Sequence, residues 1–440
     1  MTSRTFVGTV GELETLLGGA STPEPKPEIV LDERQEEAAT LVCEEPIGII
    51  TGGPGTGKST TMRVGLQRLR EKAQAKGRRA PVIALTAPTG KAARRLEETT
   101  GEMAGTVHRL LGWRPGEGWG FNAAEPLPFD AVIVDESSML DTELAAALFA
   151  ACDPRRTSLI FLGDVNQLPS VGPGRVLGDL IDTGRVPTVR LETVHRQAQK
   201  SWVYRNAPKV LEGTMPDLGE TEDFQFVEVD QPQDLAEVLV GLFEDELNRV
   251  ATQMDGSAED AFDAVQILSP QRVGPIGTGV LNKRIQAAVQ GGAAHSGGWD
   301  VHDDLIIHTE DKVIQTKNNY DLGLMNGETG IVQGIQNRNR LVVRVAGTDY
   351  GYDKSSARAL ELGYAITVHK SQGSEYATCI VVCHSAHARM LSRQLFYTAI
   401  TRAKGRLVVV GNREGLTRAV ENARVAERQT GLQERILGDA

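Results

Sequence analysis

The chain has 440 residues, four cysteines and a formal net charge of −11, from 47 basic and 58 acidic residues. This length exceeds one ordinary domain, so we expect two to four domains of roughly 100–200 residues each. No run approaches the ~18 apolar residues of a membrane span, and residues 1–20 lack the basic start and apolar core of a secretion signal. We therefore expect a cytoplasmic protein without a membrane segment.

The cysteines are too few and too scattered for a disulfide framework: Cys43, Cys152, Cys379 and Cys383. The last two lie close together beside His384, which makes a metal site the alternative. Residues 378–383, however, read as a β-strand, in which four residues span ~13 Å. That distance is too long for two ligands of one zinc ion. We expect reduced, mostly buried cysteines.

The charge is unevenly distributed along the chain. Residues 214–263 hold fifteen acidic residues and one basic residue, Arg249, whereas residues 58–95 hold eleven basic residues against Glu71. Because the distribution matters more than the sum, the negative total does not exclude a nucleic acid as partner. For the acidic segment a solvated helix face is the simpler interpretation, and a contact with a partner protein is the alternative.

The first 30 residues form an N-terminal extension that ends in a Pro-rich linker at 21–27. We expect the folded part to begin at Leu31. Asp32 is a good N-cap, and Gln35 lies three residues further on, before apolar residues at helical spacing. This spacing is that of a capping box.

The next segment, 47–60, reads as a buried strand, a glycine-rich turn and the start of a helix. Gly52, Gly57, Lys58 and Ser59 fit the G-x-x-x-x-G-K-[ST] phosphate loop. Glycines let backbone N–H groups approach phosphate oxygens, Lys58 supplies a charge to the β- and γ-phosphates, and the Ser59 hydroxyl ligates Mg²⁺. The predicted nucleotide-binding residues are Gly53, Pro54, Gly55, Thr56, Gly57, Lys58, Ser59 and Thr60.

A second small-residue turn follows a predicted strand at 81–86. It comprises Pro88, Thr89, Gly90 and Lys91, and the helix that it opens carries Arg94 and Arg95 in its first two turns. The turn lacks the G-K-[ST] ending, so it suits a nucleic-acid backbone phosphate better than a nucleotide. A short element at 106–111 follows, in which His108 alone reads as a packed or capping histidine.

Residues 113–121 read as a small hairpin punctuated by Pro-Gly and Gly. Strand alternation puts Trp119 and Phe121 on one face. These aromatic residues form the core of the hairpin itself or, alternatively, stack on bases and separate strands. The segment, with Trp113, contains half of the chain's four tryptophans.

Polar residues follow two further predicted strands. Asp135 and Glu136 end the apolar strand 131–134, and Gln167 lies in the loop after strand 158–162. Asp135 can hold Mg²⁺, Glu136 can polarise the attacking water, and Gln167 can sense the γ-phosphate. Four strand–loop–helix units with polar strand ends predict a parallel α/β sheet with its ligands at the carboxyl edge.

From Leu31 to Gly411 the motifs resemble those of superfamily 1 helicases, in particular the RecD-like branch that includes the phage Dda-type enzymes. The loop Gly163-Asp164-x-x-Gln167-Leu168-Pro169-x-Val171 is the most discriminating piece. Later segments agree with it, at 194–197, 267–270, 281–286, 364–375 and 395–403.

The resemblance assigns roles to further residues. Arg196 and Arg402 are expected to reach the γ-phosphate, where arginine stabilises the charge of the transition state, so the nucleotide would lie between two domains. Gln35 reads the adenine edge if it is not simply the far half of the capping box. The residues expected to hold single-stranded DNA are Pro88, Thr89, Gly90, Lys91, Thr106, Val107, His108, Thr367, His369, Lys370, Ser371 and Gln372. The hairpin residues Trp113, Trp119 and Phe121 occupy the position of the family's separation pin.

The resemblance also implies an architecture of two RecA-like α/β motor domains with a pin and an SH3-like insertion. We expect motor domain 1 at 31–190 with the pin at about 112–128. Motor domain 2 would comprise 191–302 and 361–440, divided by the SH3-like insertion at 303–360, where strands at 312–315, 330–332 and 341–345 are separated by turns.

The implied function is an ATP- and Mg²⁺-dependent DNA helicase that acts as a monomer on single-stranded and forked or tailed duplex DNA in a bacterial or phage-infected cell. Movement in the 5′→3′ direction is implied by the branch alone. The alternative is an ATP-gated translocase or remodelling subunit of a replication or repair complex, without unwinding activity of its own.

Overall fold

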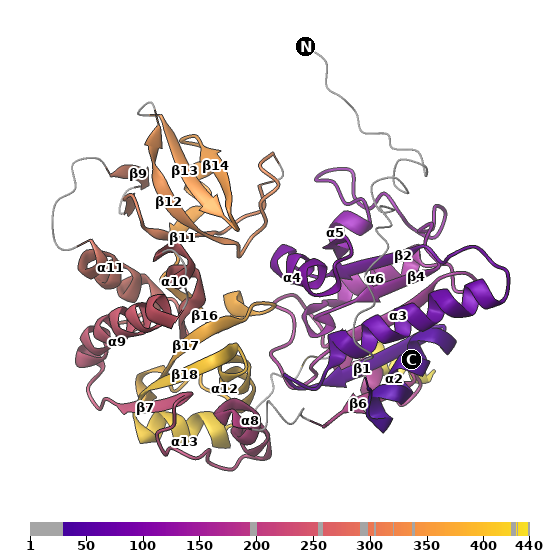
Figure 1. Ribbon diagram of the computed structural model, residues 1–440, viewed down its shortest axis with the longest axis horizontal. Coiled ribbons are helices and arrows are strands. Elements are labelled where there is room, and N and C mark those ends of the chain that lie inside the picture. Colours follow the sequence, from indigo (N-terminus) through magenta and orange to yellow (C-terminus); the bar gives the residue numbers. More distant parts are fainter. Residues whose placement is uncertain are drawn as a thin grey trace.

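The computed structural model describes residues 30–193, 200–253, 258–290, 298–302, 305–319, 321–336, 339–423, 428 and 430–438. Two parallel α/β units lie side by side, and an antiparallel sheet sits above the second of them (Figure 1). This arrangement confirms the predicted fold class. The predicted extension at 1–30 lies, apart from Val30, outside the described residues.

We call the two α/β units motor domain 1 and motor domain 2, after the predicted architecture. Motor domain 1 has a six-stranded parallel sheet in the order β3-β2-β4-β5-β1-β6. The central strands are buried on both faces, as expected for a sheet covered by helices on two sides. The strands are β1 (Ile47–Gly52), β2 (Ile83–Ala87), β3 (Ala104–Thr106), β4 (Ala131–Val134), β5 (Ser158–Gly163) and β6 (Thr188–Leu191). The helices are α2 (Glu33–Glu44), α3 (Lys58–Ala75), α4 (Gly90–Thr100), α5 (Val107–Leu110), α6 (Thr142–Ala151) and α7 (Val176–Asp182), with the 3₁₀ turn η1 (Ser137–Met139).

Motor domain 2 has a five-stranded parallel sheet in the order β16-β8-β17-β18-β7. Its strands are β7 (Phe224–Glu228), β8 (Val265–Ser269), β16 (Ala365–Thr367), β17 (Tyr376–Cys383) and β18 (Ala403–Gly411). Its helices are α8 (Trp202–Glu212), α9 (Pro232–Gln253), α10 (Ala258–Ala264), α11 (Thr278–Val289), α12 (Arg393–Ile400) and α13 (Arg413–Glu421), with the 3₁₀ turns η4 (Val368–Ser371) and η5 (Ser385–His387). The predicted strand at 378–383 is confirmed, and Cys379 and Cys383 are both buried and free.

The small antiparallel sheet, in the order β14-β13-β12-β11-β15, shares a core with motor domain 2. Val313 and Leu324 pack in the same apolar cluster as Ile267 and Ile380 of the motor sheet. Because one continuous core joins them, the small sheet and motor domain 2 form one packed unit. The strands are β11 (Lys312–Gln315), β12 (Thr329–Gln336), β13 (Arg340–Val345), β14 (Thr348–Tyr352) and β15 (Leu360–Leu362), joined by η3 (Ser356–Ala359), beside the pair β9 (Trp299–His302) and β10 (Leu305–Ile307).

The segment 113–121 differs from the predicted hairpin. Its ladder is one bridge long, between Arg114 and Gly118, and the chain then folds back so that the N–H groups of Gly120 and Phe121 donate to the carbonyl of Leu111. The strand alternation on which a common face for Trp119 and Phe121 was based is therefore absent, although both side chains pack against the core of motor domain 1. Gly118 has a positive φ of 83°, which breaks the strand before alternation is established.

The end of the chain returns from motor domain 2 to motor domain 1, which no sequence pattern predicted. Helix α14 (Leu432–Leu437) packs against α7, where Leu432 and Ile436 join the core of motor domain 1. Nearby, Arg428 Nη1 donates to the carbonyl oxygens of Gly172 at 2.7 Å and Gly174 at 2.9 Å. These contacts hold the C-terminal segment on the loop that follows β5.

Replacing Arg428 by alanine should lower the free energy of unfolding. The guanidinium bonds two loop carbonyls, and hydrogen bonds to a charged group contribute about 1.5–3 kcal/mol each at most. We expect the free energy of unfolding to fall by about 1.5–3 kcal/mol in total. Urea unfolding measures this loss, with the dependence of that free energy on urea concentration (the m-value) unchanged. Arg435→Ala, at an exposed position of α14, is the matched control and should leave stability nearly unchanged. Equal losses in the two variants would contradict the anchoring role of Arg428.

Candidate nucleotide and single-strand sites

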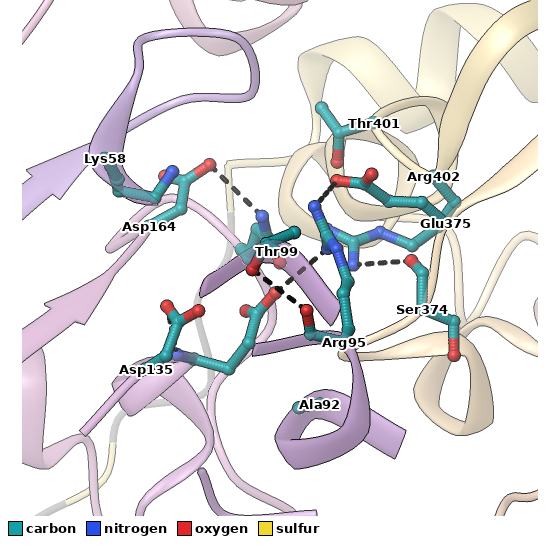
Figure 2. Close-up of polar contacts among 12 residues, drawn as sticks. Lys58, Ala92, Arg95, Thr99, Asp135, Asp164, Ser374, Glu375, Thr401 and Arg402 are labelled. Atoms are coloured by element: carbon teal, nitrogen blue, oxygen red, sulfur yellow. Dashed lines mark hydrogen bonds and ion pairs between the residues drawn. The ribbon is translucent and has the colours of Figure 1, made fainter. Parts of the chain in front are cut away.

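A cavity of about 230 Å³ lies between the two motor domains and is lined by residues of both. Figure 2 shows Lys58, Asp135 and Asp164 of motor domain 1 facing Glu375, Thr401 and Arg402 of motor domain 2. The lining residues are Pro54, Gly55, Thr56, Gly57, Lys58, Ser59, Thr60, Arg95, Asp135, Glu136, Asp164, Gln167, Glu375, Thr401 and Arg402. Most of the predicted catalytic and nucleotide-binding residues therefore converge on one cavity.

The phosphate loop has the geometry that its glycines permit. Gly55 and Gly57 adopt φ angles of 69° and 83°, in the left-handed region that favours glycine. Gly57 is the N-cap of α3, so Lys58 starts the helix and points its side chain back over the loop. There Lys58 Nζ donates to the carbonyls of Gly52 at 2.7 Å and Gly53 at 3.0 Å. Gly53 itself lines a neighbouring cavity, together with Tyr204 and Tyr397.

Asp135 and Glu136 follow β4 directly, as predicted, and line the same cavity as Ser59. Burial and the neighbouring Glu136 carboxylate raise the pKa of Asp135 to about 6. Glu136 has a φ of 49°, a left-handed conformation that costs a non-glycine residue about 1–3 kcal/mol. Its carboxylate is thus held in place by the surrounding structure at an energetic cost.

The oxygen donors of Ser59 and Asp135 fit Mg²⁺. Among the residues that the structure describes, no group of three or more His, Cys, Asp or Glu side chains is arranged to hold a metal ion. Magnesium is commonly held by one or two protein oxygens together with phosphates and waters, so a complete protein cage is not needed. The hydroxyl and the carboxylate would hold the ion next to the phosphates.

Gln167 lies in the loop after β5 and connects with motor domain 2. Its amide donates to Asp164 Oδ2 at 3.4 Å, and the same oxygen accepts a 2.7 Å bond from the hydroxyl of Tyr397 on α12. The N–H of Leu168 donates to Thr398 Oγ1 at 2.8 Å, and Gln372 Nε2 donates to the carbonyl of Leu168 at 2.7 Å. We call this set of contacts the interdomain seam. It lies directly beside the nucleotide cavity.

Of the two predicted arginine fingers, the structure describes one. Arg402 is 2% exposed, and its guanidinium donates to the carbonyls of Thr398 at 3.1 Å and Ser374 at 3.0 Å. It lines the cavity opposite the phosphate loop. Arg196 lies outside the described residues, so its role stays a prediction.

Gln35 forms the capping box that was one of its two predicted roles. Its N–H donates to Asp32 Oδ1 at 2.9 Å, and its side-chain oxygen accepts from the N–H of Asp32 at 3.1 Å. Its Nε2 donates to the carbonyl of Thr56 at 3.1 Å, which ties α2 to the phosphate loop. Gln35 is 1% exposed. Reading of an adenine edge by Gln35 stays a prediction.

The three basic side chains of α4 all contact motor domain 2 or the small sheet. The sequence had led us to expect contacts with backbone phosphates. Lys91 Nζ bonds the Tyr376 hydroxyl at 3.2 Å and lies over its ring, and Arg94 pairs with Glu328 of the small sheet at 2.9 Å. Arg95 donates to Glu375 at 2.5 Å. Sequence alone could not reveal these acidic and aromatic partners, because they lie more than 230 residues away.

A second cavity, of about 580 Å³, lies among the start of α4, the start of α5, the 113–121 segment and the small sheet. Five of the residues predicted to hold a single strand line it, and so do Trp113 and Met325. Those five are Pro88, Thr89, Gly90, Thr106 and His108. Thr89 and Thr106 each cap the helix that follows, so helix N-termini face this space.

Three other residues predicted to hold the strand are buried and bonded within the protein instead. Val107 and Ser371 are 0% exposed, and Gln372 is 5% exposed and belongs to the interdomain seam. Thr367 caps η4, and Lys370 pairs with Glu361 at 3.3 Å. His369 lines a different cavity, near Arg428, and burial lowers its pKa. A role of all six residues in holding a strand stays a prediction.

The aromatic residues of the pin segment pack on α5. The rings of Trp119 and His108 lie 5.6 Å apart, those of Trp113 and His108 5.9 Å, and those of the two tryptophans 6.4 Å. Burial lowers the pKa of His108 within this cluster. The cluster joins the predicted pin to a predicted strand-binding residue. Trp119 and Phe121 also both pack against the core of motor domain 1.

Three family profiles match the chain. They are described as an AAA domain at 30–231, an ATP-dependent RecD-like DNA helicase SH3 domain at 281–345 and a UvrD-like helicase C-terminal domain at 362–410. The RecD subunit of the RecBCD enzyme of Mycolicibacterium smegmatis is 35% identical over 92% of this chain and 75% of its own length. The chain belongs to the RecD-like helicase family. An ATP-dependent RecD2 DNA helicase of Deinococcus radiodurans is 37% identical over 92% of this chain, which spans 52% of that relative's length.

Solved structures of Pif1 helicases share the fold of this RecD-like chain. A structure of two coordinating Pif1 helicases at forked double-stranded DNA has a TM-score of 0.55 at 18% identity, over 93% of this chain and 98% of that chain. Bacteroides Pif1 with ADP-AlF3 and single-stranded DNA has a TM-score of 0.53 at 18% identity, over 87% and 92% of the two chains. These likenesses show a shared fold, and it is the RecD relative that confirms the predicted membership of the RecD-like branch. No helix among the described residues of this RecD-like chain is long and apolar enough to cross a membrane.

Several residues of the nucleotide cavity or the seam were assigned no role at the nucleotide, among them Arg95, Asp164, Glu375 and Tyr397. Asp164, Glu375 and Tyr397 stood within quoted motifs, beside residues with assigned roles. For Asp164 the signal that could have found it is its charge just after the predicted strand 158–162, where ligands gather in parallel sheets.

The raised pKa of Asp135 predicts how nucleotide binding depends on pH. A carboxyl group with a pKa of about 6 is protonated below that pH and then ligates Mg²⁺ poorly. The affinity for Mg²⁺·ADP should therefore be constant above pH 7 and fall roughly tenfold per pH unit below about 6. Fluorescent ADP titrated from pH 5 to 8 measures this effect, with metal-free ADP as control. A flat profile for Mg²⁺·ADP would contradict the assignment of Asp135.

Proposed function

We propose that this chain is an ATP-dependent DNA helicase that moves along single-stranded DNA in the 5′→3′ direction. The main support is one cavity lined by the phosphate loop of motor domain 1 and by Arg402 of motor domain 2. Closure of such a cavity depends on the bound nucleotide, so hydrolysis changes the position of the two domains relative to each other. The second cavity, at the start of α4, offers helix N-termini and aromatic rings to a strand.

In this proposal each residue of the nucleotide cavity has a distinct role. Lys58 neutralises the β- and γ-phosphates, and Ser59 and Asp135 hold Mg²⁺, which supplies further charge stabilisation when bound. Glu136 accepts a proton from the attacking water and orients it. Arg402 stabilises the charge that spreads over the γ-phosphoryl oxygens in the transition state. Gln167 is placed to sense that phosphate and to pass its presence to α12 through Asp164 and Tyr397.

A second candidate function is that of an ATP-driven translocase subunit within a larger complex, without unwinding activity of its own. It is favoured by the similarity to RecD, which is named as a subunit of the RecBCD enzyme and of which this chain spans 75%. In that case replication or repair proteins would be its partners. The two functions differ in whether the isolated chain separates strands.

The main test compares wild type with Lys58→Ala. Wild type should hydrolyse ATP faster in the presence of single-stranded DNA and should unwind a 5′-tailed duplex. Lys58→Ala should lose at least a hundredfold in hydrolysis, because one charge on the transferred phosphate is missing. Hydrolysis without unwinding would favour the translocase subunit. Unwinding of a 3′-tailed duplex alone would refute the proposed direction.

The aromatic cluster allows a separate test of strand separation. Trp113→Ala should lower unwinding at least fivefold and change DNA-stimulated hydrolysis less than twofold, because Trp113 lines the strand cavity and not the nucleotide cavity. Phe121→Ala is the comparison, since Phe121 packs on the core and should affect both activities through stability alone. Equal losses of unwinding and hydrolysis in Trp113→Ala would mean that Trp113 only packs on α5.

A further inference from the structure

Helix α4 reaches both cavities. Its N-cap Thr89 and first residue Gly90 line the strand cavity, and Arg95 on its second turn lines the nucleotide cavity. An α-helix rises ~1.5 Å per residue, so these positions are ~8 Å apart along one rigid element. A displacement of the start of α4 is therefore transmitted to Arg95 with little loss.

The first turn of α4 also touches motor domain 2. A β-carbon at Gly373 would come within 3.0 Å of Ala92 Cβ and 3.2 Å of Thr89 Oγ1, so the two backbones approach closely there. Two residues further along the same turn, Glu375 faces Arg95 (Figure 2). The contact of α4 with residues 373–375 thus joins a helix that lines both cavities to Glu375, which lines the nucleotide cavity.

Arg95 lies between two carboxylates, one from each motor domain. Its Nη2 donates to Glu375 Oε1 at 2.5 Å, whereas its Nη1 lies 3.8 Å from Glu136 Oε1. Glu375 is also paired with Lys404, at 3.4 Å. Burial alone would lower the pKa of Arg95, but the carboxylates of Glu375 and Glu136 outweigh burial and raise it. The guanidinium is therefore charged, bound to Glu375 and within reach of Glu136.

We propose that Arg95 is a positioning residue that couples occupancy of the strand cavity to Glu136. A strand bound at the start of α4 shifts this helix against residues 373–375, and the guanidinium moves from Glu375 toward Glu136. The carboxylate of Glu136 is then oriented toward the attacking water. This inference rests on the proposed function, because it assigns to Arg95 the stimulation of hydrolysis by DNA.

The test measures kcat and KM for ATP hydrolysis with and without an oligothymidylate, and the Kd of the oligonucleotide by fluorescence anisotropy. In Arg95→Gln, the factor by which DNA raises kcat should fall at least tenfold, while KM for ATP and the Kd for DNA change less than threefold. Glu375→Gln should also lower this factor. In the Arg95→Gln/Glu375→Gln double variant, the factor by which DNA raises kcat should be no lower than in Arg95→Gln alone. Both substitutions remove the same Arg95–Glu375 contact, so their effects do not add.

Arg94→Gln is the matched control. It removes the neighbouring arginine of α4, whose partner Glu328 lies outside the nucleotide cavity, and it should keep the stimulation factor within twofold of wild type. If Arg95→Gln does not fold, Arg95→Lys and Glu375→Gln carry the test. Arg95→Lys keeps the charge but loses the planar guanidinium with its several N–H donors. The factor by which DNA raises kcat should therefore lie between those of wild type and Glu375→Gln.

Three results would overturn the proposal. A stimulation factor unchanged in Arg95→Gln would show that Arg95 does not couple the sites. A tenfold rise in KM with kcat preserved would make Arg95 a nucleotide ligand instead. A fall of kcat by the same factor with and without DNA would make it a general structural residue. By contrast, wild-type protein without any stimulation by DNA would refute the proposed function itself.

Discussion

The architecture depends on the interdomain seam, the buried hydrogen bonds that join the loop after β5 to α12. Asp164 is 1% exposed, and burial raises its pKa, so its carboxylate needs the Tyr397 hydroxyl that motor domain 2 supplies. A buried polar group that loses its partner costs about 1–3 kcal/mol. Parting the two motor domains at this point therefore costs about 1–3 kcal/mol for this bond. Other contacts across the boundary, made by the basic side chains of α4, are ion pairs and one hydrogen bond, in which these side chains are partly exposed.

Two of these contacts of α4 have buried partners. Lys91 and Arg94 reach motor domain 2 and the small sheet, and their partners Tyr376 and Glu328 belong to one packed unit. Arg94 and Glu328 form an ion pair whose carboxylate is buried, whereas Lys91 donates to a neutral tyrosine. The small sheet also places Met325 against Gly90, where a β-carbon would lie 2.5 Å from Met325 Cγ. Glycine at position 90 is thus needed for the small sheet to approach the start of α4.

Much of the fold and of the nucleotide site could be predicted from the sequence, because the relevant chemistry is local. The phosphate loop, the carboxylates after β4 and the polar loop after β5 each follow a strand, and parallel strands bring their carboxyl ends to one edge. The second motor sheet and the small sheet followed from the resemblance. These predictions needed no knowledge of distances between remote segments.

Several residues make contacts that their sequence context did not indicate, and some of these contacts join segments far apart in the chain. Lys91 and Gln372 looked like strand-binding residues by type and position, yet each is bonded across the interdomain boundary. The side chain of Gln35 is bonded both within its own capping box and to the phosphate loop, which local spacing could not distinguish from a free amide. In the pin segment, two left-handed glycines, Gly116 and Gly118, interrupt the expected strand alternation.

The return of α14 to motor domain 1 has a topological consequence. The polypeptide crosses between the two motor domains twice, once between β6 and α8 and once between α13 and α14. The two domains are therefore joined by two covalent connections. A second covalent connection limits how far the two motor domains can separate. Cutting the chain after α13 would release this connection while leaving every motif in place.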